Sequence, residues 1–197
     1  MARFRKHSCT KSEFVNDHHR FERWYRDNTL YFITARCKDR YHAFKNEDAK
    51  AVFWDRFTHY AAQCGFVPWI ATLMVNHYHV LGYLKVGENL GPMMQRVHGS
   101  VAKLVNDLLP ERRVPFWRER GRRDYFDGCL RDELQCRRAY RYTYLQSVRA
   151  GVFRDPRDYP HTRVYLDLDR GVRRALELDA FMEGVPYQRY EHRRPRC

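Results

Sequence analysis

The chain has 197 residues, a formal net charge of +13 at pH 7 and a pI near 9.7. This length suits one domain with short extensions, and a hydrophobic content of 44% is enough for a core. Arginine carries most of the positive charge, and a guanidinium both contacts phosphate in a forked geometry and stacks on bases. With 15% aromatic residues, the composition favours a nucleic acid with exposed bases over a basic protein without a polyanionic partner.

The six cysteines contain no Cys-x-x-Cys pair, and their spacing matches no zinc motif, so we expect reduced thiols. The N-terminal segment has no apolar stretch of the kind found in signal peptides. No apolar run is long enough to span a membrane. We therefore expect a cytoplasmic, nucleoid-associated protein.

The first half of the chain alternates polar segments with strong secondary-structure patterns. Residues 1–28 are polar and basic, which predicts an N-terminal arm. Residues 30–37 are β-branched and aromatic and predict a strand. Apolar residues at helical spacing predict a helix over 47–64, and Gly65 is placed to end it.

The following segments predict a pair of strands and two further helices. Residues 66–75 and 77–84 predict two strands joined by a short turn. Helical periodicity returns over 89–109 and again over 131–149. The segment between these helices, 114–127, is a connector with a short extended piece.

The C-terminal part has weaker patterns. Residues 163–168 and 171–183 predict a short apolar segment and a last helix, and the tail is basic. We divide the chain into the arm, a domain over 29–162 and a C-terminal extension over 163–197. The order of elements predicts an α+β fold, an antiparallel sheet with helices mainly on one face, with basic extensions at both ends.

His77 and His79 flank Tyr78 in a predicted strand. Alternate strand residues point to the same face, so both imidazoles can reach one divalent cation. A His-x-His pair also occurs by chance on polar sheet faces. The pair by itself therefore leaves both interpretations open.

The helix predicted over 131–149 contains three closely spaced tyrosines. Tyr142 and Gln146 are four residues apart and share one helix face, together with Arg138 and near Arg149. Tyr140 and Tyr144 lie on a different face that is suited to packing. Tyr142 is therefore set apart from the core and surrounded by positive charge and an amide.

Together these motifs resemble the single-tyrosine (Y1) HUH transposases of the IS200/IS605-like family, and most closely the branch of REP-associated tyrosine transposases. MVNHYHVL is similar to the family's strand motif of two histidines around a bulky hydrophobic residue. The run from Tyr142 to Gly151 is similar to the family's catalytic helix, although Gln146-Ser147 stands where many relatives have Asn-Pro. The resemblance covers about residues 28–162 and implies the ferredoxin/RRM-like HUH fold.

The resemblance also implies an activity. It implies an enzyme that cleaves and rejoins single-stranded DNA with imperfect hairpins through a 5′-phosphotyrosine. Tyr142 would be the nucleophile, and His77, His79 and Gln146 would bind Mg²⁺ or Mn²⁺. The family implies a monomer or a homodimer, and the role is transposition or the processing of repetitive palindromic elements.

Arginines are the predicted DNA contacts in this scheme. They lie in the connector, on the third helix and in the tail: Arg118, Arg120, Arg122, Arg123, Arg138, Arg149, Arg193 and Arg194. The alternative function is a non-catalytic, domesticated module that binds hairpin DNA or RNA. A purely structural metal site is disfavoured because closed zinc sites usually have four ligands.

Overall fold

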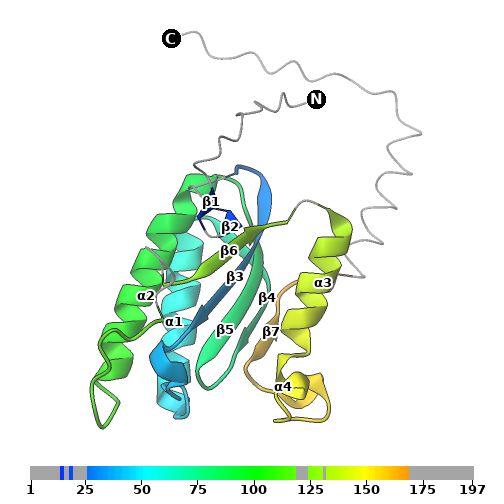
Figure 1. The fold of residues 1–197 in the computed structure, drawn as a ribbon. Coiled ribbons are helices and arrows are strands. Elements are labelled where there is room, and N and C mark those ends of the chain that lie inside the picture. Colours follow the sequence, from blue (N-terminus) through cyan, green and yellow to red (C-terminus); the bar gives the residue numbers. More distant parts are fainter. Residues whose placement is uncertain (1–13, 16–17, 20–25, 119–123, 131, 169–197) are drawn as a thin grey trace, which may run out of the picture.

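A computed structural model of the chain describes residues 14–15, 18–19, 26–118, 124–130 and 132–168. Figure 1 shows a five-stranded antiparallel sheet with helices on both of its faces, in the strand order β6-β3-β5-β4-β7. These strands are β3 (Thr29–Arg36), β4 (Phe66–Leu73), β5 (His77–Leu84), β6 (Phe126–Cys129) and β7 (Thr162–Val164). The helices are α1 (Glu47–Gln63), α2 (Leu90–Asn106), α3 (Glu133–Tyr144) and α4 (Gln146–Arg149), with 3₁₀ turns at Lys38–Arg40, Gly87–Asn89 and Pro156–Asp158. The predicted α+β fold with an antiparallel sheet is confirmed.

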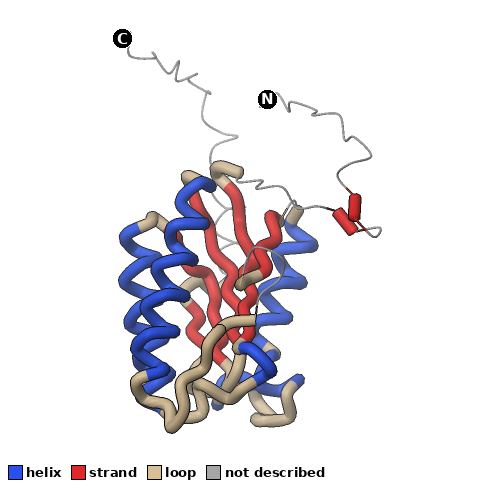
Figure 2. Tube along the Cα trace, turned by 60° about the vertical axis from the view of Figure 1, so that its left-hand side comes forward, coloured by secondary structure: helices blue, strands red, loops and turns tan. Residues whose placement is uncertain are grey.

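Both faces of the sheet are packed against helices (Figure 2). The main core, which includes Ile33, Tyr78 and Val80, lies on the face covered by α1 and α2. The opposite face carries a second cluster in which Ile70 and Leu81 pack against α3. The prediction of helices mainly on one face holds for the two longest helices, but α3 lies on the other side. This placement puts α3 over the face to which alternate residues of β5 point.

The helix predicted over 131–149 is interrupted. It begins after Asp132, whose side chain accepts a hydrogen bond from the Gln135 amide, and it ends at Tyr144. Leu145, with φ −88° and ψ 9°, separates α3 from the short α4. The prediction of one regular helix was therefore wrong at this point. Gln146 starts a new helix rather than continuing the face of Tyr142.

Further predicted features lie at the end of α1, in the connector and at the C-terminal boundary. Gly65 follows α1 with a φ of +72°, a conformation that favours glycine, as predicted for a helix end. The extended piece predicted within 114–127 corresponds to β6, which pairs with β3 but begins only at Phe126 and runs two residues past the predicted end. β7 begins at Thr162, pairs with β4 and so continues the sheet across the predicted boundary at 162/163. The helix predicted over 171–183 lies outside the described residues.

Two pairs of residues in the predicted N-terminal arm form a separate small sheet. β1 (Phe14–Val15) and β2 (His18–His19) pair antiparallel.

The cysteines in the described part of the chain are all free thiols, as expected. None of the helices in that part has the length and apolar character that a membrane crossing requires.

Candidate active site

His77 and His79 lie side by side on the face of β5 that α3 covers. Their ring centroids are 5.1 Å apart, with the rings nearly perpendicular. Between them Tyr78 points to the opposite face and is buried in the main core. The predicted shared face of the two imidazoles is thus observed, and it follows from the two-residue period of a strand.

The turn before β5 fixes the orientation of the His77 ring. The side-chain amide of Asn76 donates from Nδ2 to the carbonyl of Arg40, 3.0 Å away. Its Oδ1 lies 2.7 Å from His77 Nδ1 and can only accept, so Nδ1 carries the proton. His77 therefore keeps the lone pair on Nε2, the arrangement typical of a metal ligand whose other nitrogen is held by a neighbour.

His79 is held in a similar way from β3. Thr34 lies opposite His79 in the pairing of β3 with β5, and its hydroxyl is 2.8 Å from His79 Nδ1. When that nitrogen donates to the hydroxyl, Nε2 is again left with its lone pair. The ring of Phe32 stacks parallel to the imidazole at 5.7 Å and restricts its rotation. Both imidazoles can therefore offer Nε2 to the same space.

Gln146 supplies the third polar group. Its side chain is 6% exposed and lies beside His77. Its Nε2 is buried without a hydrogen-bond partner among the described residues, and a buried amide of this kind calls for an explanation. Within the described residues, no group of three His, Cys, Asp or Glu side chains is placed to hold a metal ion. Two imidazole nitrogens and one amide oxygen form an incomplete ligand set, which fits a cation that keeps open positions.

Burial keeps both histidines neutral. It lowers the pKa of His77 to about 4, assisted by the charge of Arg36 and opposed by the hydrogen bond that the protonated ring can donate to Gln146. Burial likewise lowers the pKa of His79 to about 3, assisted by the charges of His77 and Arg36. Neutral imidazoles are the form that binds metal ions, so the pair is ready to act as ligands at physiological pH.

These shifts predict an acid-sensitive protein. Because the folded state disfavours the protonated imidazoles, stability is greatest above the unfolded-state pKa near 6.5 and falls as the pH drops toward about 4 for His77 and about 3 for His79. Between pH 7 and pH 5 we expect the metal-free protein to lose about 2 to 4 kcal/mol, on the scale of 1.4 kcal/mol per pKa unit for each group. Urea unfolding in EDTA at the two pH values measures this loss. The double variant His77→Gln/His79→Gln should show a much smaller loss, and an equal loss in both proteins would contradict the cause.

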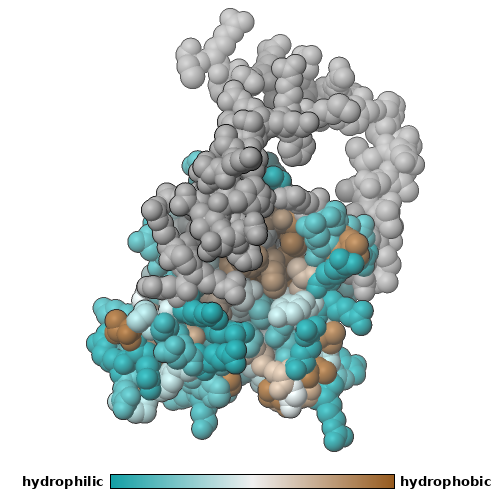
Figure 3. All heavy atoms as spheres, in the orientation of Figure 1, coloured by the Kyte–Doolittle hydropathy of each residue, from teal (hydrophilic) through white to brown (hydrophobic). Residues whose placement is uncertain are grey.

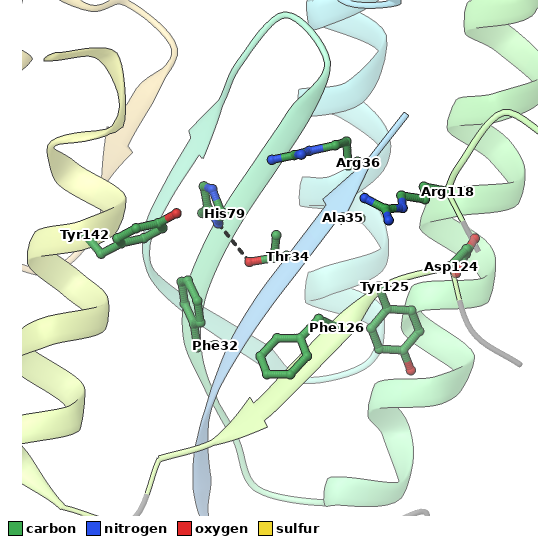
Figure 4. A pocket seen from close by; sticks show the side chains of 10 residues that line it. All are labelled: Phe32, Thr34, Ala35, Arg36, His79, Arg118, Asp124, Tyr125, Phe126 and Tyr142. Atoms are coloured by element: carbon green, nitrogen blue, oxygen red, sulfur yellow. Dashed lines mark hydrogen bonds between the residues drawn. The ribbon is translucent and has the colours of Figure 1, made fainter. Parts of the chain in front are cut away.

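Tyr142 meets the histidines from the opposite side. Its ring lies edge-on to His79 at 5.0 Å and to Phe32 at 6.1 Å, and its hydroxyl is directed toward His79 (Figure 4). The side chain is 38% exposed, and the guanidinium of Arg149 sits 4.9 Å from the ring centroid. Tyr142 is therefore both accessible and next to the imidazole pair.

The neighbouring tyrosines are placed differently. Tyr140 and Tyr144 pack against the cluster that joins α3 to the sheet, as predicted from their spacing. The hydroxyl of Tyr140 donates to the carbonyl of Leu166 at 2.9 Å. Tyr142 therefore lies on a different face of α3 from Tyr140 and Tyr144, since the helix ends only after Tyr144.

A pocket of about 250 Å³ adjoins this group. It lies over β3 and β6 and is lined by Phe32, Thr34, Ala35, Arg36, His79, Arg118, Asp124, Tyr125, Phe126 and Tyr142. Sequence reasoning missed Thr34, Arg36 and Asp124. A strand period alone puts Thr34 and Arg36 on one face, but only the pairing of β3 with β5 places them opposite His79 and His77.

The predicted DNA-binding arginines fall into two groups. Arg118 lines the pocket, Arg138 is exposed on α3 and Arg149 contacts Tyr142 from α4. The others lie outside the described residues: Arg120, Arg122, Arg123, Arg193 and Arg194.

No protein-family model and no curated protein matches this sequence. Among solved structures, it is similar to a REP-associated tyrosine transposase bound to a REP hairpin, with a TM-score of 0.61 and 16% identity over 79% of this chain and 86% of that one. The chain has the fold of a tyrosine transposase. The resemblance drawn from the HYH motif and the tyrosine helix is therefore confirmed for the fold. A second similar structure is named as a transposase from Deinococcus radiodurans R1, with 17% identity over 61% of this chain and 92% of that one, but at a TM-score of 0.44 it adds no weight.

Proposed function

We propose that the protein is a metal-dependent transesterase that cleaves and rejoins single-stranded, hairpin-containing DNA through a 5′-phosphotyrosine on Tyr142. The observation that carries this proposal is the convergence of the Tyr142 ring and two metal-competent imidazoles, His77 and His79, at the edge of a pocket that contains arginines. A binding module needs no accessible tyrosine beside such a pair. The hairpin-bound transposase with the same fold supports the choice of substrate.

The chain's own residues divide the chemistry among them. His77 and His79 would hold Mg²⁺ or Mn²⁺ through Nε2, and Gln146 would hold it through its amide oxygen. When bound, the cation would polarise the scissile phosphate and offset its negative charge. Arg149 and Arg36 place fixed positive charge on either side of the same region, where a phosphate would lie.

The covalent step conserves the phosphodiester. The Tyr142 hydroxyl loses its proton and attacks phosphorus, the bond to the 3′ oxygen breaks, and that oxygen takes up a proton as a free 3′-hydroxyl. One phosphodiester replaces another, so a later attack by a 3′-hydroxyl can reseal the strand without ATP. All four proposed residues come together within one chain, which supports a site completed in cis, in either a monomer or a homodimer.

The test is formation of a covalent adduct. The full-length protein is incubated with Mn²⁺ and a hairpin oligonucleotide carrying a single-stranded 5′ extension, and the products are separated under denaturing conditions. We expect a protein–DNA band that disappears with EDTA and with a perfect duplex of the same sequence. Hairpin binding without an adduct on any hairpin tried would favour the non-catalytic module instead.

A further inference from the structure

The pocket extends well beyond the proposed metal ligands. It runs from Tyr142 and His79 at one end to Arg118 and Asp124 at the other (Figure 4). Its volume of about 250 Å³ is below the range of about 300–1,000 Å³ typical of drug-sized ligands, so it suits a single small ring system. Figure 3 shows apolar side chains gathered in the hollow beside α3.

The sides of the pocket offer aromatic surfaces. Phe126 is 37% exposed and lines the pocket. Phe32 lies on the neighbouring strand, two residues before Thr34, which is the direct pairing partner of Phe126. Tyr142 lines the end of the pocket near the histidines. Exposed aromatic rings beside arginines are the usual platform for an unstacked base.

A buried histidine contacts the carboxylate of Asp124. Its Oδ2 lies 2.7 Å from Nδ1 of His98, a residue of α2 that is 2% exposed, in a close polar contact that is not a hydrogen bond of regular geometry. The other ring nitrogen of His98 is 2.7 Å from the hydroxyl of Tyr78, and its ring stacks on Trp117 at 4.3 Å. The carboxylate is therefore in contact with a buried imidazole, while 36% of the Asp124 side chain remains exposed to solvent.

We propose that this pocket receives one unpaired nucleobase next to the scissile phosphate, and that Asp124, positioned by His98, selects guanine together with Arg118. The inference rests on the proposed function. An ionised carboxylate only accepts hydrogen bonds, and guanine is the base that presents two adjacent N–H donors, N1–H and N2–H, on one edge. Arg118 can donate to the neighbouring O6, the contact arginine makes most often in base recognition. Adenine, cytosine and thymine each place an acceptor beside their donor, which the carboxylate would repel.

The test is base selectivity in binding, which does not require cleavage. Each unpaired nucleotide of the hairpin oligonucleotide is replaced in turn by an abasic site, and the sensitive guanine is then replaced by inosine, which lacks the 2-amino group, and by adenine. Affinity is measured by fluorescence anisotropy in EDTA. For the wild type we expect one position where inosine or adenine weakens binding at least about fivefold, the lower limit for a bidentate base contact.

Two variants decide the role of the carboxylate. Asp124→Asn turns an acceptor into a donor, so the ratio of guanine to inosine affinity should fall to near one while affinity for the abasic oligonucleotide is unchanged. Asp127→Asn alters a carboxylate that does not line the pocket and should retain the wild-type ratio. His98→Gln should lower the ratio partially, with folding checked by thermal unfolding.

The outcomes separate this inference from the proposed function. If the wild type forms the covalent adduct but no unpaired base matters, another base is preferred, or Asp124→Asn keeps the preference for guanine, the base pocket is wrong and the transesterase stands. If base selectivity is found without any adduct, the pocket stands and the catalytic proposal is wrong. A protein that binds no hairpin oligonucleotide overturns both.

Discussion

Tyr142→Phe should eliminate the covalent protein–DNA adduct while leaving the fold and hairpin affinity close to those of the wild type. The substitution removes only the hydroxyl, and the ring keeps its edge contacts with His79 and Phe32. Because the side chain is 38% exposed, its hydroxyl can be removed without leaving a buried polar atom unpaired. Loss of the attacking group should lower the cleavage rate by at least about a thousandfold, as removal of a covalent nucleophile does in other enzymes. Single-turnover kinetics with a labelled hairpin measure this rate.

The neighbouring tyrosines provide matched controls. Tyr140→Phe breaks the hydrogen bond to the Leu166 carbonyl and should cost about 1 kcal/mol of stability, with the adduct still formed. Tyr144→Phe keeps the ring that packs between α3 and the sheet, so it should also form the adduct. An adduct mapped by peptide analysis to Tyr140 or Tyr144, or full activity of Tyr142→Phe, would overturn the assignment.

The sequence predicted most accurately what depends on local periodicity. The strand 77–84 was placed with its observed bounds, and a two-residue period was enough to bring His77 and His79 to one face. Helical spacing likewise separated Tyr142 from Tyr140 and Tyr144, because all three lie within the regular part of α3. These features can be predicted without knowing what each strand or helix packs against.

What the sequence could not predict depends on contacts between distant segments. Thr34 and Arg36 lie 45 and 41 positions before the histidines they face, and only the register of β3 against β5 brings them together. Asp124 joins the pocket through a buried histidine of α2, for which no local pattern exists. Gln146 was selected for its i+4 spacing from Tyr142, but the break at Leu145 means that α4, rather than that spacing, places its amide beside His77.

Removing the imidazoles should have the second large effect. His77→Ala and His79→Ala each remove a nitrogen ligand from the proposed set of three, so Mn²⁺ affinity should fall by at least the 10–100-fold that loss of a supporting contact costs at a metal site. We expect the double variant to lose cleavage altogether, since the remaining amide of Gln146 cannot hold the cation alone. Hairpin affinity in EDTA should change by less than about threefold, because phosphate contacts supply most of the binding free energy.

Two comparisons isolate the metal from general damage to the sheet. His59→Ala removes an exposed imidazole on α1 and should keep Mn²⁺ binding, measured by calorimetry, and cleavage. Asn76→Asp keeps an acceptor for His77 Nδ1 but weakens the hold on the Arg40 carbonyl, so it should retain measurable activity where His77→Ala has none. If the double alanine variant cuts at the wild-type rate, the cation site lies elsewhere. If the double variant binds Mn²⁺ normally yet fails to cut, His77 and His79 are not ligands of the cation. They would then act on the phosphate directly, together with Tyr142 and its neighbouring arginines.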